Sequence, residues 1–505
     1  MTASANALQE RTYRFGPLDR PGWLLGMGGA QCLALGAGVL GLGVLLTNGL
    51  PVPIALAPAV AGALLSFTSW RGRPVHEQLP ALATHGTQLA LGRRRWTAPV
   101  PLLTGTAADA GRGVDLPPFL DGLELLDGGP LPWCPTGGGF GVVRDRDGDT
   151  LSATVTVHSG AFALLERGDQ ERALARWGDV LAAFCGERRP ISRVRVTEHA
   201  APSGVGDHER FVAEYGADPT SSAPRRAYDE LLAAAGPGAV GHEVLVTLTV
   251  DQRRVRVRRG PTLDAAVETL GEELRLLTSR LESAGLGVGP PLSASALARV
   301  MRERLDPTRA GAVGTGPRPL ADLAGLDVTR RYGPMATENG WSEVRVDGTY
   351  HRTYWVAEWP RLEVGPSWLE PLVLHPGGTR TFSVHYEPVA PTRSQRRIDR
   401  DTTRLAADEE QRSRAGFRIG ARHRRAEAAV LERETELVAG YAELEFAGFV
   451  TVSAADQEAL DRSCAEYEQA AGQAGLDVRA LDARHDLGLV CALPVARGLA
   501  RRWNG

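Results

Sequence analysis

The sequence contains no lysine, so all 57 of its basic residues are arginine. A phosphate-binding loop of the GxxxxGK[ST] type needs a lysine that reaches the β- and γ-phosphates. Schiff-base chemistry, the lysine–glutamate pair of protein kinases and the serine–lysine hydrolases need a lysine as well. The chain therefore lacks all four of these kinds of site.

Other catalytic and metal-binding patterns are also missing. The five cysteines are scattered without a CxxC pair, which argues against a disulfide framework or a zinc cage and favours a reducing compartment. The eleven histidines show neither HExxH nor HxH spacing, and no GxSxG nucleophile elbow occurs. We therefore predict no catalytic residue, no cofactor, no metal and no enzymatic activity; a tethered enzyme with an unrecognised site stays open as an alternative.

Neither sign of charge dominates the composition. The chain has 505 residues and a formal net charge of −3, with 60 acidic residues against the 57 arginines. This length predicts about two or three domains. The near balance argues against a protein that coats nucleic acid along its whole length, although local basic patches remain possible contacts.

Two long stretches near the amino terminus carry no charged residue. Trp23–Leu46 has 24 residues and Pro51–Trp70 has 20, so helices over them could each cross a hydrocarbon core of about 30 Å. Arginines flank the pair on both outer sides, which predicts two spans in the plasma membrane with both termini cytoplasmic. A cleaved signal peptide would be shorter, whereas a buried globular hairpin stays open. Small residues, with Ala34 and Gly38 at small-xxx-small spacing, predict close helix–helix contact, either within the hairpin or with another membrane subunit. The glycines that would allow it are Gly36, Gly38, Gly41 and Gly43.

The flanks of these spans supply candidate membrane contacts. Residues 76–91 are predicted to form an amphipathic helix that ends in an arginine run at the membrane interface, with a solvated helix end as the alternative. Tryptophan favours the headgroup region. The candidate interface anchors are Trp23, Trp70 and Trp96, and the candidate contacts to anionic lipid or an anionic partner are Arg93, Arg94 and Arg95.

The remainder of the chain alternates predicted strands and helices. Strands are expected at Phe140–Arg144, Thr150–His158, Ile191–Thr197, Glu243–Val250, Thr353–Trp359, Thr381–Glu387, Tyr441–Val452, Asp477–Leu481 and Asp486–Leu493. Helices are expected at Asp169–Cys185, Leu263–Ser283 and Ala455–Ala474, with one or two long charged helices between Thr392 and Gly440. We predict an α+β fold in which an N-terminal two-helix transmembrane hairpin precedes cytoplasmic ferredoxin-like β-α-β units and a long charged helix.

This reading divides the chain into seven parts. They are a cytoplasmic tail (1–22), the transmembrane hairpin (23–70), an interfacial basic helix (71–96), a linker (97–136), a first α+β domain (137–290), a linker or insertion (291–350) and a second α+β part with charged helices (351–505).

One arginine-rich segment, Arg253–Arg259, is predicted to continue a strand. At a period of two, Arg254, Arg256 and Arg258 would line one face and could meet phosphates, anionic lipid or an acidic partner. An edge strand protected by charge against aggregation is the alternative. No aromatic residue interleaves with the arginines, which disfavours binding of single-stranded nucleic acid.

The order of these segments resembles two parts of a known machine. The hairpin, followed by Gly72-Arg73-Pro74-Val75-His76-Glu77 and the Arg-Arg-Arg-Trp run, is similar to the small two-span inner-membrane subunit of type IV secretion systems, the PrgI-like class. The remainder resembles the amino-terminal, non-ATPase domain of the conjugation ATPases of the TraC/TrwK class. The segments that resemble it are 150–162, 354–360, 381–388, 449–453 and 475–495.

The resemblance, to a fusion of these two parts as in some actinobacterial systems, implies a membrane-anchored structural subunit. In the ATPase class a motor follows the Leu-Pro segment, which lies here at Leu493-Pro494, whereas this sequence stops at Gly505. The implied partners are a separate secretion ATPase, other membrane subunits, the lipid bilayer and further copies of the chain in a ring. A type VII secretion membrane component and a membrane-tethered nucleic-acid-binding module stay open as alternatives.

Overall fold

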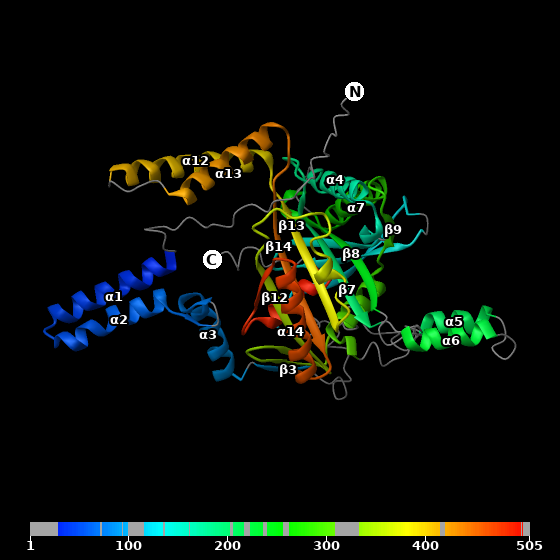
Figure 1. Ribbon diagram of the computed structural model, residues 1–505, viewed down its shortest axis with the longest axis horizontal. Coiled ribbons are helices and arrows are strands. Elements are labelled where there is room, and N and C mark those ends of the chain that lie inside the picture. The colour runs from blue at the N-terminus through cyan, green and yellow to red at the C-terminus, as the bar shows by residue number, and fades with distance from the viewer. Residues whose placement is uncertain are drawn as a thin grey trace, which may run out of the picture.

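The centre of the molecule is a 13-stranded sheet in which every strand pairing is antiparallel (Figure 1). The computed structural model describes residues 29–70, 73–92, 94–98, 116–134, 137–160, 162–202, 206–216, 223–235, 240–255, 262–308, 333–414, 420–495 and 497. The strands follow the order β3-β10-β11-β12-β14-β13-β7-β8-β6-β5-β4, while β15 also pairs with β12 and β9 also pairs with β6.

The sheet consists of two halves with the same connectivity. The first half contains β4 (Leu123–Pro130), β5 (Gly139–Asp145), β6 (Thr150–His158), α4 (Arg167–Ala182), β7 (Ile191–Pro202), β8 (Val240–Asp251), α7 (Leu263–Ser283) and β9 (Gly287–Pro291). The second contains β10 (Ala336–Asn339), β11 (Val344–Val346), β12 (Thr349–Glu358), α11 (Glu370–Val373), β13 (Thr379–Pro388), β14 (Leu444–Ala454), α14 (Gln457–Gln473) and β15 (Asp477–Ala480). The order β9-β6-β8-β7 in the first half corresponds to β15-β12-β14-β13 in the second.

The two halves meet edge to edge through β7 and β13. These strands pair antiparallel, with Val196 opposite Val384. Because equivalent strands face each other at this seam, an approximate two-fold axis normal to the sheet relates the halves. Equivalent buried threonine pairs mark the relation, since Thr154 and Thr247 are joined by a hydrogen bond of 2.9 Å and Thr353 and Thr451 by one of 3.0 Å.

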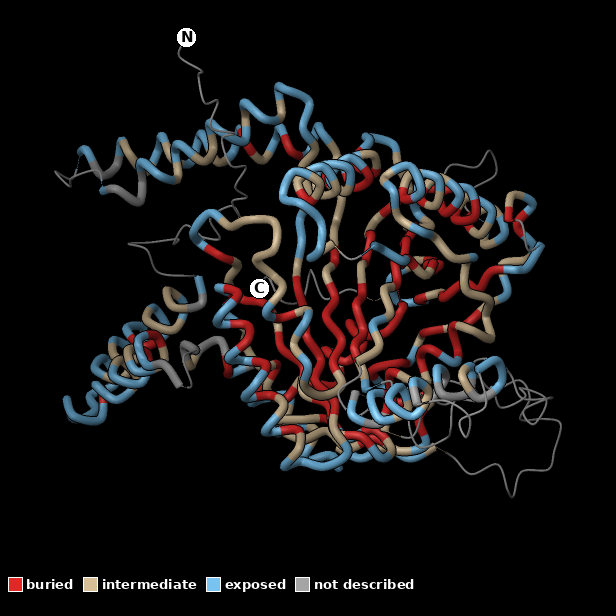
Figure 2. The backbone as a smooth tube through the Cα atoms, turned by 45° about the vertical axis from the view of Figure 1, so that its right-hand side comes forward, coloured by how far each residue is buried: buried red, intermediate tan, exposed pale blue. Residues whose placement is uncertain are grey.

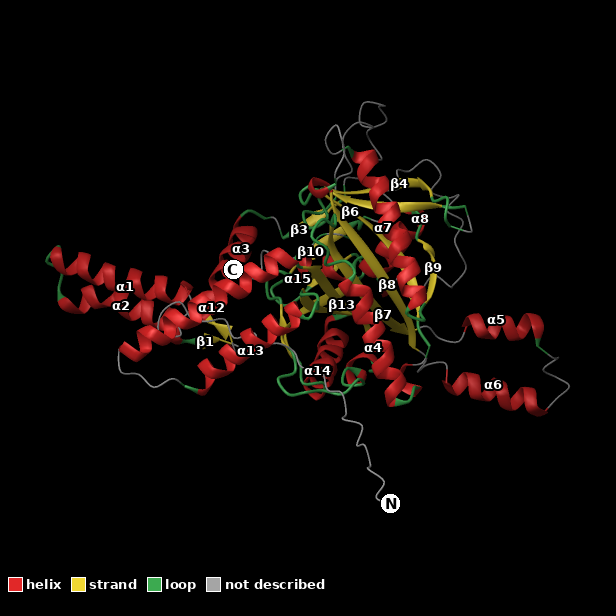
Figure 3. Ribbon diagram, turned by 90° about the horizontal axis from the view of Figure 1, so that it is seen from above, coloured by secondary structure: helices red, strands yellow, loops and turns green. Residues whose placement is uncertain are grey.

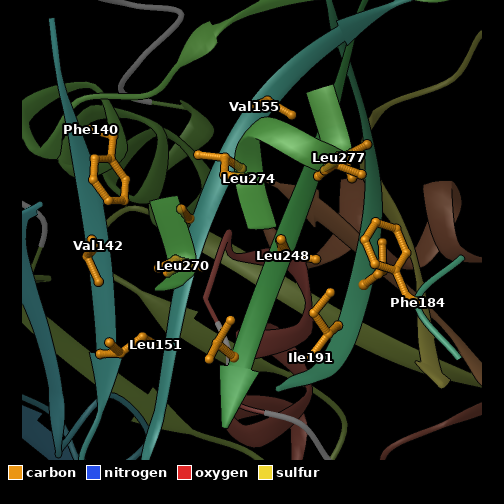
Figure 4. Packing of buried hydrophobic residues seen from close by; sticks show 14 of the residues in the cluster. Phe140, Val142, Leu151, Val155, Phe184, Ile191, Leu248, Leu270, Leu274 and Leu277 are labelled. Atoms are coloured by element: carbon orange, nitrogen blue, oxygen red, sulfur yellow. The ribbon is translucent and has the colours of Figure 1, made fainter. Parts of the chain in front are cut away.

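One face of the sheet packs against helices through apolar side chains. In the first half, Leu270, Leu274 and Leu277 of α7 pack against the strands that carry Leu151 and Leu248 (Figure 4). In the second half, α14 packs in the same way on the face of β12, β13 and β14. Buried residues therefore concentrate in the strands and in the inner faces of these helices (Figure 2).

Shorter elements cover the opposite face. Helix α8 (Ala294–Leu305) follows β9, and α15 (His485–Leu489) with the 3-10 turn η7 (Val490–Ala492) follows β15, so each half ends in a covering helix. Their apolar residues, together with Leu493 and Val495, form a second core cluster with β4, β5 and β11.

Helical hairpins project from this body (Figures 1 and 3). Helices α5 (Gly206–Tyr215) and α6 (Ala223–Ala235) are inserted between β7 and β8, and α12 (Pro391–Arg414) and α13 (Ala421–Val438) between β13 and β14, the equivalent connection. Since β7 and β13 are antiparallel, these insertions leave opposite ends of the sheet. Helices α1 (Gly29–Thr47) and α2 (Val52–Phe67) contact α3 (Val75–Ala90) and project on the same side as α12 and α13.

The predicted fold class is wrong in two respects. Within the ranges described, no helix is both long enough and apolar enough to cross a membrane, so the transmembrane hairpin at 23–70 is not correct. The described part of α1 has 19 residues, and α2 has 16 residues, which is about 24 Å against a core of about 30 Å. The ferredoxin-like units are also not separate, because pairing of β7 with β13 joins both halves into one sheet.

Three further segments differ from expectation. Asp486–Leu493 is not a strand: α15 and η7 occupy it, because its residues are buried against the sheet on several sides and do not alternate. The predicted linker or insertion at 291–350 contains α8, β10 and β11, and the predicted linker at 97–136 contains β4. Trp70 lies in the two-residue strand β1 (Ser69–Trp70), which pairs with β2 (Arg73–Pro74), and Trp23 is outside the described residues.

Glycines allow α1 and α2 to lie in direct backbone contact. A Cβ atom at Gly62 would lie 2.6 Å from the carbonyl oxygen of Ala34, and one at Gly38 would lie 2.7 Å from that of Pro58. The close contact predicted at Ala34, Gly38 and Gly41 is thus confirmed within the hairpin. It is wrong at Gly36 and Gly43, where a Cβ atom would meet nothing within 4 Å.

Replacement of Gly62 by valine is expected to separate the two helices. The valine side chain would clash with the backbone of α1 at Ala34, which can move only if the whole helix moves. Overpacking of this kind costs about 1–3 kcal/mol. Hydrogen–deuterium exchange in detergent micelles should then become faster over residues 29–67. Gly43→Val is the matched control, because a Cβ atom there meets nothing within 4 Å. Equal exchange in both variants would contradict the packing.

Candidate functional site

Buried polar side chains line the sheet face beneath α8, α15 and η7. Cross-strand register places them in two equivalent rows, one per half. The rows are Thr154-Thr247-Arg195-His385 and Thr353-Thr451-Thr381-His199. The first row thus has an arginine where the second has a threonine. This departure from symmetry lies directly under residues 490–495 and 497, here called the carboxyl-terminal segment.

Arg195 holds that segment against the sheet. Its side chain is 1% exposed, and Nη1 donates to the carbonyl oxygens of Leu493 (2.7 Å) and Val490 (3.4 Å), while Nη2 donates to that of Arg497 (2.7 Å). Within the described residues no carboxylate pairs with Arg195. Burial lowers the pKa of Arg195 to about 10, so the guanidinium is charged at neutral pH and its hydrogen bonds are charge-assisted.

Arg497 extends this attachment to the acidic turn between β5 and β6. Its guanidinium donates to the carbonyl oxygen of Phe119 (3.0 Å) and to the carboxylates of Asp145 (3.1 Å) and Asp147 (3.2 Å). Asp149 in the same turn pairs with Arg253. These carboxylates therefore pair with arginines. No group of residues that could hold a metal occurs in the described part of the chain.

The buried histidines and thiols are held in unreactive forms. His199 shares a hydrogen bond of 2.8 Å with Thr381, and burial lowers the pKa of His199 well below its usual value. Burial raises the pKa of Cys185 to about 11 and that of Cys491 to about 12, which disfavours the thiolates that attack substrates. These groups act as structural contacts within the core.

The arginines after α3 belong to the edge of the sheet. Arg95 and Trp96 lie in β3 (Arg95–Thr97), which pairs with β10, and Arg95 forms an ion pair of 2.9 Å with Glu338. Nε of Arg94 donates to the carbonyl oxygen of Asn339 (2.9 Å), and Arg93 is outside the described residues. The basic helix predicted over residues 71–96 is therefore too long. Helix α3 ends at Ala90, and Arg95 and Trp96 instead belong to the sheet, where they pair with β10.

The predicted arginine strand is not formed in the described part of its range. Gln252–Arg254 adopts the 3-10 turn η5, in which the Asp251 carboxylate accepts a hydrogen bond from the backbone N–H of Arg253. Arg256 and Arg258 lie outside the described residues. Arg254 is exposed and lines a pocket together with Arg188 and Arg393, two residues that the sequence analysis did not single out.

The α1–α2 hairpin exposes apolar side chains around both helices. Leu33 is 75% exposed, Leu40 71% and Phe67 69%, and no charged residue occurs between Gly29 and Phe67. Other exposed members are Val39, Val44, Val52, Ile54, Leu56, Val60 and Leu64. Apolar surface of this extent marks a site that binds lipid or protein.

No family model matches the chain, and no curated protein matches it either. Its function must therefore be inferred from the hairpin, the arginines and the segment held by Arg195.

Proposed function

We propose that this protein is a structural subunit of a type IV secretion machine, of the conjugative-transfer kind. It attaches to the cytoplasmic face of the plasma membrane through the α1–α2 hairpin, and a separate motor ATPase supplies the energy. The observation that carries the proposal is a charge-free hairpin, exposed on both helices, that projects from a body whose buried ionisable groups make structural contacts.

Lipid is the proposed occupant of the hairpin surface. A groove on a partner protein would cover one face of a helix pair, whereas Leu33, Leu40 and Phe67 are exposed along its length and no charged residue interrupts it. Insertion into the membrane surface without crossing it would remove this area from water and is compatible with the 16-residue length of α2.

The proposed division of labour rests on the chain's lack of lysine. A motor of the P-loop class needs a lysine that binds the phosphates of its nucleotide. In this proposal a separate polypeptide therefore provides the motor. The order of segments that resembles the secretion proteins supports the choice of machine. The ordered carboxyl-terminal segment, fixed by Arg195 and Arg497, offers a rigid place from which such a motor could be positioned.

Charging the hairpin is expected to abolish membrane attachment. In flotation with vesicles of phosphatidylglycerol and phosphatidylcholine, the native protein should rise with the lipid. A Leu40→Arg/Val44→Arg variant should stay at the bottom of the gradient, with at least a tenfold lower bound fraction, because guanidinium groups resist burial in hydrocarbon. Leu362→Arg is the control, since Leu362 is 81% exposed on the body. Equal flotation of the double variant would refute the attachment.

The partner is tested by co-expression with the proteins encoded beside it. Purification in mild detergent should retain an identified P-loop ATPase. ATP turnover by the purified chain alone would refute the division of labour, whatever the outcome of flotation.

A further inference from the structure

A pocket at the seam between the two halves collects guanidinium groups. Its volume is about 350 Å³, and its walls come from the α4–β7 connection, the turn η5 after β8 and the start of α12. Its charged lining residues are Arg188, Arg189, Arg253, Arg254, Arg393 and Glu187. Five arginines therefore face one carboxylate.

Three of the arginines have carboxylate partners outside the lining. Arg189 pairs with Glu273 at 3.0 Å, Arg253 with Asp149 at 2.6 Å and Arg254 with Asp251 at 3.3 Å. These pairs fix the positions of the three side chains and leave only part of their charge for a ligand.

Arg188 and Arg393 differ from these three. Both are exposed, and among the residues that the structure describes neither guanidinium group has a hydrogen-bond or ion-pair partner. They enter the pocket from different halves of the sheet, Arg188 before β7 and Arg393 in the first turn of α12. Because both guanidinium groups line the same pocket, an anion bound there would be attracted by both.

An anion of the protein already occupies the start of α12. The Glu187 carboxylate accepts hydrogen bonds from the hydroxyl of Thr392 and from its backbone N–H (3.2 Å). These bonds, with Arg396 and Arg188 nearby, lower the pKa of Glu187. The amino terminus of a long helix favours negative charge, so this end of the pocket has the electrostatics of an anion site.

We propose that the pocket binds a small phosphate-bearing anion through Arg188 and Arg393. Each guanidinium presents a planar pair of donors that matches phosphate oxygens, and the paired arginines behind them add positive potential. Phe184, the aromatic residue of the lining, is 2% exposed, so recognition depends on phosphate and not on stacking against a base. Bound phosphate would tie the base of the α12–α13 hairpin to the first half of the sheet.

Pyrophosphate is the probe for this site. Calorimetric titration of the full chain at low ionic strength should give saturable binding at one site, weakened by added salt. Arg188→Gln/Arg393→Gln should lower the affinity at least tenfold. The matched control is Arg361→Gln, which removes an exposed arginine that is paired with Glu358 and does not line the pocket, and it should keep native affinity. Absence of saturable binding, or an equal loss in the control, would overturn the proposal.

A second readout reports the link to the helical hairpin. Pyrophosphate should slow hydrogen exchange at the start of α12 in the native protein but not in the double variant. An anionic lipid headgroup would present the same chemistry, and competition identifies it: pyrophosphate should then release the native protein from phosphatidylglycerol vesicles to the level of the double variant. If vesicle binding ignores both pyrophosphate and the substitutions while pyrophosphate binds at the pocket, the ligand is a soluble phosphate compound.

Discussion

Replacement of Arg195 by methionine is expected to release the carboxyl-terminal segment and to lower the free energy of unfolding by about 3 kcal/mol. Methionine fills much of the same volume but donates no hydrogen bond. The carbonyl oxygens of Val490, Leu493 and Arg497 would lose a charged donor. Those of Val490 and Leu493 would keep only a backbone N–H donor, and a hydrogen bond to a charged group contributes about 1.5–3 kcal/mol. Removal of the desolvated charge of Arg195 offsets part of this loss.

Urea denaturation and hydrogen exchange measure the two parts of this effect. Exchange should become faster over residues 490–497 in Arg195→Met. Arg380→Met is the matched control, because Arg380 is also 1% exposed but donates to the carbonyl oxygen of Val373. That variant should lose stability without selective exposure of residues 490–497. Unchanged protection of the segment in Arg195→Met would exclude Arg195 as its attachment.

The sequence predicted elements well where local signals coincide. The strand at Thr150–His158 and the helix at Leu263–Ser283 have the bounds expected from alternation and from helical spacing. Thr262 is the N-cap of the helix, because its hydroxyl accepts a hydrogen bond from the backbone N–H of Ala265. Such signals act over a few residues and need no knowledge of distant pairing.

No local pattern in the sequence predicted that β7 pairs with β13. The register that sets Val196 opposite Val384 joins segments from different halves of the chain, and nothing in either segment selects the other. The repeat was equally hidden, because the threonine pairs that correspond in the two halves sit among otherwise different residues. Only the strand order reveals it.

The candidate site was missed for a related reason. Alternation in β7 indicates that its two faces differ, but it does not say that the face with Arg195 and His199 is covered by the carboxyl-terminal segment. The basic pocket likewise joins Arg188 to Arg393 across the seam. The arginine run at Arg253–Arg259 indicated the region of the pocket. Its start forms the turn η5 and not a strand, and there the backbone N–H of Arg253 donates to the Asp251 carboxylate.

The folded protein is expected to lose stability as the pH falls from about 6.5 towards 4, with His351 as a main cause. Nε2–H of His351 donates to the carbonyl oxygen of Leu305 (3.0 Å), which leaves Nδ1 to accept from the hydroxyl of Ser453 (2.8 Å). Burial lowers the pKa of His351 from its usual 6.5 to about 4, against a smaller opposite effect of Leu305 and Asp306. The folded state therefore keeps this imidazole neutral.

The sign follows from proton binding in the two states. Between pH 6.5 and 4 the unfolded chain protonates this histidine while the folded chain does not, so acid favours unfolding. The difference between the pKa of His351 in the unfolded chain, 6.5, and in the folded chain, about 4, corresponds to about 3 kcal/mol of unfolding free energy, at about 1.4 kcal/mol per pKa unit. His199 and His385, whose pKa values burial also lowers, act in the same direction. The raised pKa values of Glu198, Glu303 and Asp486 oppose it, because their folded forms bind protons more readily.

Comparison of variants isolates the contribution of His351 from these opposing groups. His351→Gln keeps a donor for Leu305 but cannot titrate, so its urea-unfolding free energy should fall less steeply between pH 6.5 and 4, by up to about 1.4 kcal/mol per unit. Because the variant begins less stable at pH 7 yet loses less on acidification, the two curves should converge. Parallel curves would mean that His351 is protonated in the folded state, with its hydrogen bond to Ser453 reversed.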